Sequence, residues 1–311
     1  MCPQLLLPKS REEEPLELSF KKIRHFGEMI KFEHTIFALP FAYLGAFLAV
    51  QGIPSYSQLL WITLAMVGAR TAAMALNRLI DRHIDARNPR TADRHIPRGV
   101  LSVTEVWLYV AVSWALLLVS AWQLNPLHQS VPLTVKLMPI AVFILTIYPY
   151  MKRFSWTCHL VLGIADGLAP AGAWVGVTGR LDLPAILLGL AVATWVAGFD
   201  LIYACQDYEF DRDHGIHSVP ARFGLKTALV LSGLLHIATI IFLIWTGLVL
   251  GLGTLYWGGL IIASVIFIYE HSLVSPSDLS KLNAAFFNMN GVLSVLTFAF
   301  TLGDIIFRKI F

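Results

Sequence analysis

The residues best suited to chemistry form two acidic motifs in an otherwise apolar chain. The first motif, NRLIDRHID, places Asn77, Asp81 and Asp85 at intervals of four residues. A step of four residues slightly exceeds one turn of an α-helix, so these side chains form a ridge on one helix face. The second motif, DLIYACQDYEFDRD, repeats this interval with Asp207 and Asp211, and Tyr203 and Asp200 lie one and two turns earlier on the same expected face. One such motif is typical of a solvated helix end, whereas two with the same spacing indicate a shared function.

The chemistry that suits these motifs is binding of a metal and a phosphorylated substrate. Converging carboxylates repel one another and lose hydration, so they need a cationic partner. Oxygen ligands without histidine or cysteine at matching positions favour Mg²⁺, whose shell a substrate diphosphate would complete. Bases beside the motifs can neutralise the remaining phosphate charge. They are Arg78, Arg82, Arg94, Arg98, Lys152 and Arg153.

Apolar residues dominate the rest of the chain. Of its 311 residues, 57% are hydrophobic and 14% are charged, whereas a soluble domain carries about 25% charged residues. The apolar runs are continuous and do not alternate as β-barrel strands do, so the sequence predicts an all-α, polytopic membrane protein. The net charge of +3 is too small to favour nucleic acid as a partner. The three cysteines form no ligand or disulfide pattern.

We expect about nine transmembrane helices, with eight or ten as alternatives because only a short glycine-rich turn separates the seventh from the eighth. They are placed at 35–52, 57–80, 103–123, 134–151, 157–178, 184–206, 227–248, 251–270 and 288–307. Lysine and arginine gather before the first span and after the second, fourth and sixth. The positive-inside rule then places this side in the cytosol. We therefore expect a cytosolic tail at 1–30 and one transmembrane domain at 31–311, in the inner (cytoplasmic) membrane.

The second and sixth spans carry the two motifs, so their helices run in the same direction. Two parallel halves, about 31–154 and 155–311, would bring the motifs together at the cytosolic surface. A secondary transporter is the alternative outside enzymes. Transporter acids usually lie near the membrane midplane on broken helices, whereas these acids lie at helix ends beside arginine-rich loops, which favours a diphosphate.

The motifs together resemble those of the UbiA superfamily of intramembrane prenyltransferases. NRLIDRHID and DLIYACQDYEFDRDHGIHSVPARFG resemble the two aspartate-rich motifs of the family, NPRTADRHIPRG its basic loop, and YPYMKRF its Tyr-Pro-x-x-Lys-Arg segment. The similarity covers nearly all of the expected spans. It is greatest for the 4-hydroxybenzoate polyprenyltransferase branch. KFEHTIFALPFAYLGA and FFNMNGVLSV resemble the members that serve menaquinone synthesis by the futalosine route.

The resemblance implies a helical bundle around a central cavity with cytosolic caps. It implies Mg²⁺-dependent transfer of a polyprenyl group from its diphosphate to an aromatic acid, such as 4-hydroxybenzoate, in ubiquinone or menaquinone biosynthesis. Naphthoate, haem or chlorin acceptors are alternatives. No pattern in the sequence indicates an oligomeric state.

Roles for single residues follow from the same resemblance. Mg²⁺ and diphosphate would be held by Asn77, Asp81, Asp85, Asp207 and Asp211. Contacts to diphosphate or to the acceptor's carboxylate would come from Arg94, Lys152 and Arg153, and Lys31 is a further candidate for substrate binding. Asp200 and Tyr203 would lie near the acceptor ring, with Asp200 holding or deprotonating its hydroxyl. Asp81, Asp207, Asp200 and Arg153 are the residues expected to be catalytic.

Three features leave questions open. Family members often carry lysine just before the first aspartate of the second motif, whereas this chain has Gln206, which leaves that phosphate contact open to another base. Asp166 lies inside an apolar span and has either a cavity role or a helix-packing role. The histidines expected on the basic side show no metal-ligand spacing, and solvated or hydrogen-bonded roles are expected for them. They are His34, His83, His95, His214 and His217.

Overall fold

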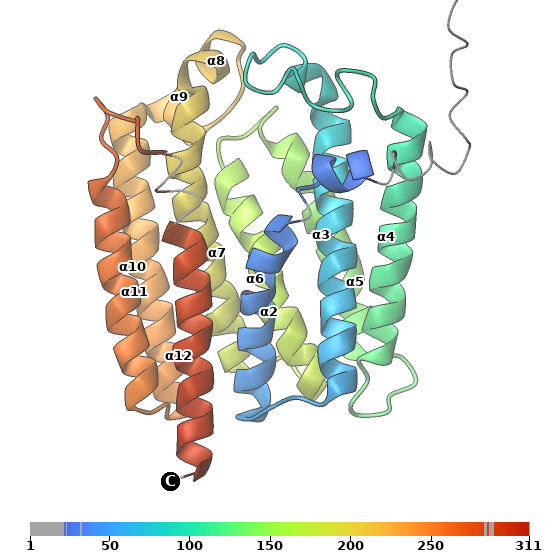
Figure 1. Ribbon diagram of the computed structural model, residues 1–311, viewed down its shortest axis with the longest axis vertical. Helices are drawn as coiled ribbons and strands as arrows, with labels where there is room; N and C mark the ends of the chain where they lie inside the picture. Colours follow the sequence, from blue (N-terminus) through green and yellow to red (C-terminus); the bar gives the residue numbers. More distant parts are fainter. Residues whose placement is uncertain (1–21, 23, 32, 283–284, 286–288, 311) are drawn as a thin grey trace, which may run out of the picture.

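The protein is a bundle of long helices that stand side by side (Figure 1). The computed structural model describes residues 22, 24–31, 33–282, 285 and 289–310. Its long helices are α2 (Glu33–Val50), α3 (Tyr56–Asp85), α4 (Val103–Gln123), α5 (Leu133–Met151), α6 (Cys158–Thr178), α7 (Leu183–Ala204), α10 (Leu225–Leu250), α11 (Thr254–Ser272) and α12 (Asn290–Ile310). Short helices follow α7 at one end of the bundle, namely η1 (Cys205–Asp207), α8 (Tyr208–Asp213) and α9 (Val219–Phe223). The expected all-α fold class is confirmed.

Eight of the described helices are long and apolar enough to cross a membrane. They correspond to the second to ninth expected spans. The first expected span corresponds to α2, whose described apolar part, Leu39–Val50, is shorter. The expected tail at 1–30 lies mostly outside the described residues.

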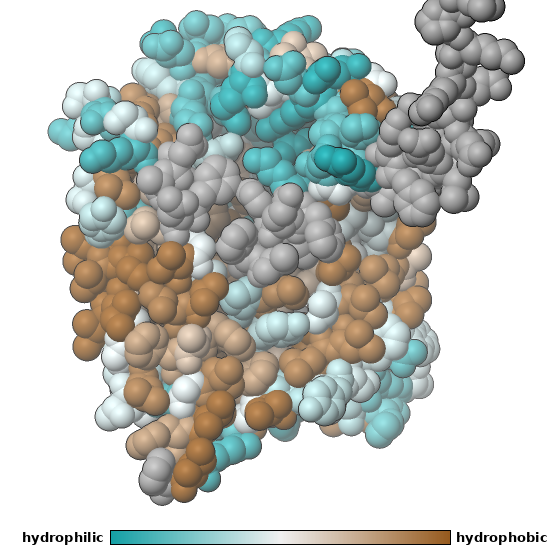
Figure 2. All heavy atoms as spheres, in the orientation of Figure 1, coloured by the Kyte–Doolittle hydropathy of each residue, from teal (hydrophilic) through white to brown (hydrophobic). Residues whose placement is uncertain are grey.

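The surface has the polarity of a protein immersed in lipid. Polar residues cover the end of the bundle that carries α8, α9 and the loop between α3 and α4, and an apolar belt follows below it (Figure 2). Large apolar side chains such as Leu108 on α4, Ile237 on α10 and Ile268 on α11 are exposed on the outer face. Lipid tails are the solvent that such side chains favour.

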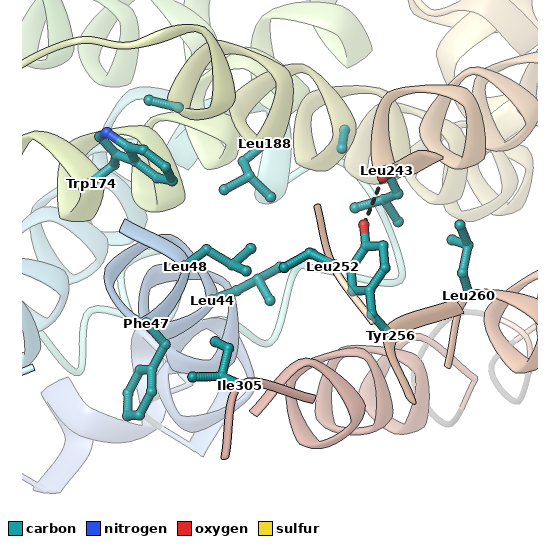
Figure 3. Packing of buried hydrophobic residues seen from close by; sticks show 12 residues of the cluster. Leu44, Phe47, Leu48, Trp174, Leu188, Leu243, Leu252, Tyr256, Leu260 and Ile305 are labelled. Carbon is teal, nitrogen blue, oxygen red and sulfur yellow. Dashed lines mark hydrogen bonds between the residues drawn. The ribbon is translucent and has the colours of Figure 1, made fainter. Parts of the chain in front are cut away.

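Helix α2 packs in the interior of the bundle. Leu44, Phe47 and Leu48 belong to one apolar cluster with residues of α6, α7, α10, α11 and α12 (Figure 3). Within this cluster the Tyr256 hydroxyl donates a hydrogen bond of 2.6 Å to the carbonyl of Leu243. This bond satisfies a polar group that has no access to water.

Small residues bring α6 and α7 into close contact. A Cβ added at Gly163 would lie 2.1 Å from the carbonyl oxygen of Ala193, and one added at Gly167 would lie 2.3 Å from that of Gly189. Only glycine allows this approach, a common device between membrane helices. The contact sets the distance between the two helices that carry His159 and Asp200.

The two acidic motifs lie at the same, polar end of the bundle. Helices α3 and α7 run in the same direction and both end there (Figure 1), as predicted. One difference from the expectation concerns the second motif. It does not lie on one regular α-helix, because the 3₁₀ turn Cys205–Asp207 separates α7 from α8. A 3₁₀ turn is more tightly wound than an α-helix, so Asp211 is rotated relative to Asp200 and Tyr203.

Candidate active site

A cavity of about 810 Å³ opens at the polar end and brings the two motifs together. Asn77 and Asp85 line it from α3, and Asp207 and Asp211 line it from η1 and α8. Five more of the expected site residues line it as well, namely Lys31, Arg94, Lys152, Asp200 and Tyr203. Its remaining walls include the apolar side chains of Phe41, Met66, Leu162, Ala169, Val196 and Phe199. The cavity therefore combines the charged side chains of the motifs at its mouth with apolar side chains of the spans.

Asp81 is positioned differently from the other acids of the motifs. It is fully buried and is not among the residues that line the cavity. Its Oδ2 lies 2.5 Å from Nζ of Lys152, and its Oδ1 lies 3.0 Å from Nη1 of Arg153. Asn77 also donates a hydrogen bond of 3.3 Å to Oδ2. Asp81 thus fixes the two bases that follow α5.

The pair of bases also joins α5 to α3 through the backbone. Arg153 donates to the carbonyl of Ile80 on α3 and to that of Pro149 on α5, both at 2.8 Å. Lys152 lines the cavity, whereas Arg153 does not. Arg153 therefore holds the helix ends together behind the site, although substrate contact was expected for it.

Asp85 lies on the cavity wall with one oxygen paired and one unpaired. Its Oδ1 is 2.7 Å from Nη1 of Arg94. Its Oδ2 is buried and accepts no hydrogen bond from any described residue. A buried carboxylate oxygen without a donor is costly unless something else, such as a cation, occupies its lone pairs.

Asp207 forms an ion pair with an arginine of the loop that follows the first motif. Arg90 donates to Oδ1 of Asp207 through Nε at 3.0 Å and to Oδ2 through Nη2 at 2.5 Å. Asn88 donates to Oδ1 at 3.0 Å, and Nη1 of Arg90 donates to the hydroxyl of Tyr203 at 3.0 Å. Burial lowers the pKa of Arg90, but its hydrogen bond to Asp207 and the nearby charges of Asp207 and Asp85 together outweigh this effect, and the net pKa is raised. Arg90 is therefore a permanent cation that links the two motifs.

Sequence reasoning missed Arg90 and Asn88 as site residues. The sequence offered one indication of such a residue: Gln206 stands where relatives often carry lysine, so a base from elsewhere in the chain could replace that lysine. Gln206 itself is exposed, and its amide donates to the carbonyl of Tyr203. Arg90 lies in the basic loop NPRTADRH, but only the folded path of that loop shows which acid it reaches.

Asp200 is held by a histidine that the sequence reasoning also missed. Oδ2 of Asp200 lies 2.7 Å from Nδ1 of His159 on α6. Nε2 of His159 accepts a hydrogen bond of 3.3 Å from the backbone N–H of Val219. Because Nε2 accepts, the neutral ring carries its proton on Nδ1 and donates it to Asp200. Both side chains line the cavity.

Two further charged residues line the cavity from the spans. Asp166 lines the cavity from α6, and this position favours its cavity role over a purely structural one. Arg70 lies on α3, and its Nε is buried and donates no hydrogen bond to any described residue. A guanidinium in this position can receive an anionic group of a ligand.

The donor set of the motifs fits Mg²⁺. Asn77, Asp85, Asp207 and Asp211 present amide and carboxylate oxygens to one cavity, and one of these oxygens lacks a donor. Mg²⁺ takes oxygen ligands and commonly binds through one or two carboxylates together with substrate phosphates.

The bundle and its cavity define a multi-span membrane enzyme of the intramembrane prenyltransferase class. Residues 38–292 match the UbiA prenyltransferase family, and the chain belongs to that family. The predicted family and enzyme class are thereby confirmed.

Named relatives agree with this assignment. The chain is 32% identical over 274 residues to a 4-hydroxybenzoate octaprenyltransferase of Vibrio cholerae, covering 88% of this chain and 92% of the relative. It is 33% identical over 254 residues to a 4-hydroxybenzoate octaprenyltransferase of Edwardsiella ictaluri, covering 80% and 85%.

Solved structures of the family share the fold. The apo structure of a UbiA homologue from Aeropyrum pernix K1 matches with a TM-score of 0.77 and 33% identity, over 90% of this chain and 98% of that one. A UbiA homologue from Archaeoglobus fulgidus bound to DMAPP and Mg²⁺ matches with a TM-score of 0.71 and 22% identity, over 90% and 98%. The second likeness concerns the fold alone.

Proposed function

We propose that this enzyme transfers a polyprenyl group from polyprenyl diphosphate to an aromatic acid of the 4-hydroxybenzoate type. The observation that carries this proposal is that acids and bases of both motifs line one cavity together with apolar side chains of the spans. An anionic head group suits the mouth, and a prenyl chain suits the interior. The relatives named 4-hydroxybenzoate octaprenyltransferase support this choice of acceptor.

Asn77, Asp85, Asp207 and Asp211 would hold Mg²⁺ at the mouth, with Asp81 supporting them from behind. Bound there, Mg²⁺ would supply positive charge that weakens the allylic C–O bond of the diphosphate. The chain's own bases provide further charge. Arg90, Arg94 and Lys152 each pair with a motif carboxylate, and each can exchange that partner for a phosphate oxygen as negative charge develops on the leaving group.

The apolar walls protect the reacting carbon. Cleavage of the C–O bond leaves an allylic cation that water would quench, and side chains such as Leu162, Ala169 and Val196 exclude water from the interior. Phe41 and Phe199 line the same space, and an aromatic face stabilises a cation by about 0.5–2 kcal/mol.

Asp200 and Arg70 would orient the acceptor. The phenolic hydroxyl donates to Asp200, which His159 holds in place, and this hydrogen bond makes the ring more nucleophilic. The acceptor's carboxylate pairs with Arg70, whose Nε has no described partner. The ring carbon then attacks the prenyl cation to form the new C–C bond, and the proton on that carbon passes to the released diphosphate, which restores the aromatic ring.

The site faces the cytosol in this proposal. The polar end carries the basic loops, including Arg90, Arg94 and the pair Lys152 and Arg153, and the positive-inside rule places such loops in the cytosol. The membrane would be the inner (cytoplasmic) membrane of the cell.

The direct test offers purified protein in detergent a polyprenyl diphosphate, Mg²⁺ and a panel of aromatic acceptors, with products read by mass spectrometry. We expect a prenylated 4-hydroxybenzoate and no product when Mg²⁺ is chelated. Product from a naphthoate alone would replace the proposed acceptor. Absence of product from every acceptor at several prenyl lengths would contradict aromatic prenyl transfer.

A further inference from the structure

A second group of metal-type ligands lies outside the aspartate motifs, at the rim of the cavity. His25 and Glu28 belong to the N-terminal segment, residues 24–30, and His95 belongs to the loop between α3 and α4. Nδ1 of His25 lies 3.4 Å from Oε2 of Glu28, and Nε2 of His95 lies 3.5 Å from the same oxygen. The three ligand atoms all lie within 4.8 Å of one another.

These separations are long for hydrogen bonds but match the edges of a small coordination shell. Charge-assisted N–H···O bonds are about 2.7–2.9 Å long. With metal–ligand bonds of about 2.0–2.1 Å, neighbouring ligand atoms of a tetrahedral site lie about 3.3–3.4 Å apart. The two histidine nitrogens are therefore already at the distance from Glu28 that a shared metal ion requires.

The charges around the group favour a transition metal over Mg²⁺. Nε of Arg24 donates to Oε1 of Glu28 at 2.9 Å, so Oε2 is the oxygen that faces the histidines. Arg94 directly precedes His95 in the chain, so a hard cation held by charge alone gains little here. Two imidazole nitrogens and one carboxylate oxygen suit Zn²⁺, which binds nitrogen ligands more strongly than Mg²⁺ does.

The ligands come from two segments that the fold holds independently. The N-terminal segment docks on α3 and α4 through Phe26, Met29 and Ile30, which join the apolar cluster of these helices. The ring of Phe26 stacks on Tyr109 of α4 at a centroid distance of 3.9 Å. The loop is held by the pair of Arg94 with Asp85, next to His95. Binding a metal therefore requires only small side-chain movements.

We propose that His25, Glu28 and His95 form a Zn²⁺-type site, with water as the fourth ligand, that fastens the N-terminal segment to the α3–α4 loop. Glu28 and His95 also line the cavity, and the same loop carries Arg90 and Arg94. An occupied site would order the loop that presents these bases to the motifs. For His95 this role goes beyond the solvated or hydrogen-bonded role expected from the sequence. The proposed site is defined by the geometry of its three ligands and is independent of which acceptor the enzyme prenylates.

The test titrates the full chain in detergent with zinc chloride against a chromophoric zinc chelator, with Mg²⁺ in large excess to occupy the aspartate motifs. We expect one tight zinc per chain, weakened at least about tenfold by His25→Ala, His95→Ala or Glu28→Gln. His83→Ala is the matched control, because His83 is exposed on α3 at the same end of the bundle. It should bind zinc as the unchanged protein does, and so should Asp207→Asn. Zinc binding that His25→Ala, His95→Ala and Glu28→Gln leave intact, or that Asp207→Asn removes, would overturn the proposal.

A second readout uses the unchanged protein and needs no variant to fold. Co²⁺ in place of zinc should give the visible absorption of a histidine-ligated, low-coordinate ion, and zinc should displace it. Zinc should also slow proteolysis within residues 24–30. An octahedral, oxygen-type Co²⁺ spectrum would show that the histidines only pair with Glu28 and do not bind a metal, and it would refute the site.

Discussion

Nδ1 of His159 on α6 lies 2.7 Å from Oδ2 of Asp200 on the neighbouring helix α7. The ring of His159 is buried and bonded through both nitrogens, so it has one orientation and one tautomer. Asp200 is thereby presented to the cavity in a fixed position. A carboxylate held in this way can position an acceptor hydroxyl without moving itself.

His159→Ala should impair use of the acceptor more than use of the diphosphate. Loss of the support lets Asp200 shift, and a misplacement of about 1 Å can reduce turnover about 100-fold. Steady-state kinetics should show a lower kcat and a higher KM for the aromatic acid, with the KM for polyprenyl diphosphate unchanged. His159→Asn, whose amide nitrogen can take the place of Nδ1, should recover much of the activity. Equal losses for both substrates, without rescue by asparagine, would argue for a merely structural role.

Asp207→Ala and Asp81→Ala should both abolish Mg²⁺-dependent transfer but should differ in stability. Removing Asp207, which contacts the cavity, should lower kcat at least about 100–1000-fold with little change in Tm. Removing the fully buried Asp81 leaves Lys152 and Arg153 without their carboxylate, so Tm should fall as well. Turnover and thermal unfolding in detergent measure both effects. Retained turnover in either variant would remove that residue from the proposed site.

Arg90→Gln should weaken binding of the diphosphate. A hydrogen bond to a charged group contributes about 1.5–3 kcal/mol, so the KM for polyprenyl diphosphate should rise about 10–150-fold. Arg87→Gln is the control, because Arg87 is exposed in the same loop and forms no ion pair with a motif acid among the described contacts. If Arg90→Gln had the same KM as the Arg87→Gln control, Arg90 would not be the base that replaces the lysine missing at position 206.

The aspartate motifs and the count of spans between them were sufficient to predict the parallel helices and the common end of the two motifs, whereas the predicted single face of the second motif is interrupted by the 3₁₀ turn Cys205–Asp207. Such local regularities depend only on helix geometry and on the membrane, which restricts each helix to one of two directions. The pairs Arg90 with Asp207 and His159 with Asp200 could not be predicted in this way. Each pair depends on how a loop or a neighbouring helix packs, and the intervals between these residues in the chain follow no periodic rule. The position of Asp81 behind the cavity, with Asp85 on its wall, is likewise a result of packing.

Gly163→Ala should destabilise the protein by separating α6 from α7. The added methyl group would lie 2.1 Å from the carbonyl oxygen of Ala193, so the helices must move apart, at a cost of about 1–3 kcal/mol. Gly172→Ala is a matched control on the same helix, because a Cβ there has no neighbour within 4 Å. Tm in detergent should fall for the first variant and not for the second. Equal Tm values would mean that the close helix contact contributes little to stability.

Arg70→Met should change the choice of acceptor, because this guanidinium is the proposed partner of the acceptor's carboxylate. Its Nε is buried and donates no hydrogen bond to any described residue, so a bound carboxylate would supply the acceptor that this nitrogen lacks. We expect a rise of about 10-fold or more in the KM for 4-hydroxybenzoate, the loss of one charge-assisted hydrogen bond. Phenols without a carboxylate should react equally well with the variant and the unchanged enzyme. A rise in the KM for polyprenyl diphosphate in place of these effects would move Arg70 to the diphosphate side of the cavity and leave the acceptor's carboxylate to the bases at the mouth.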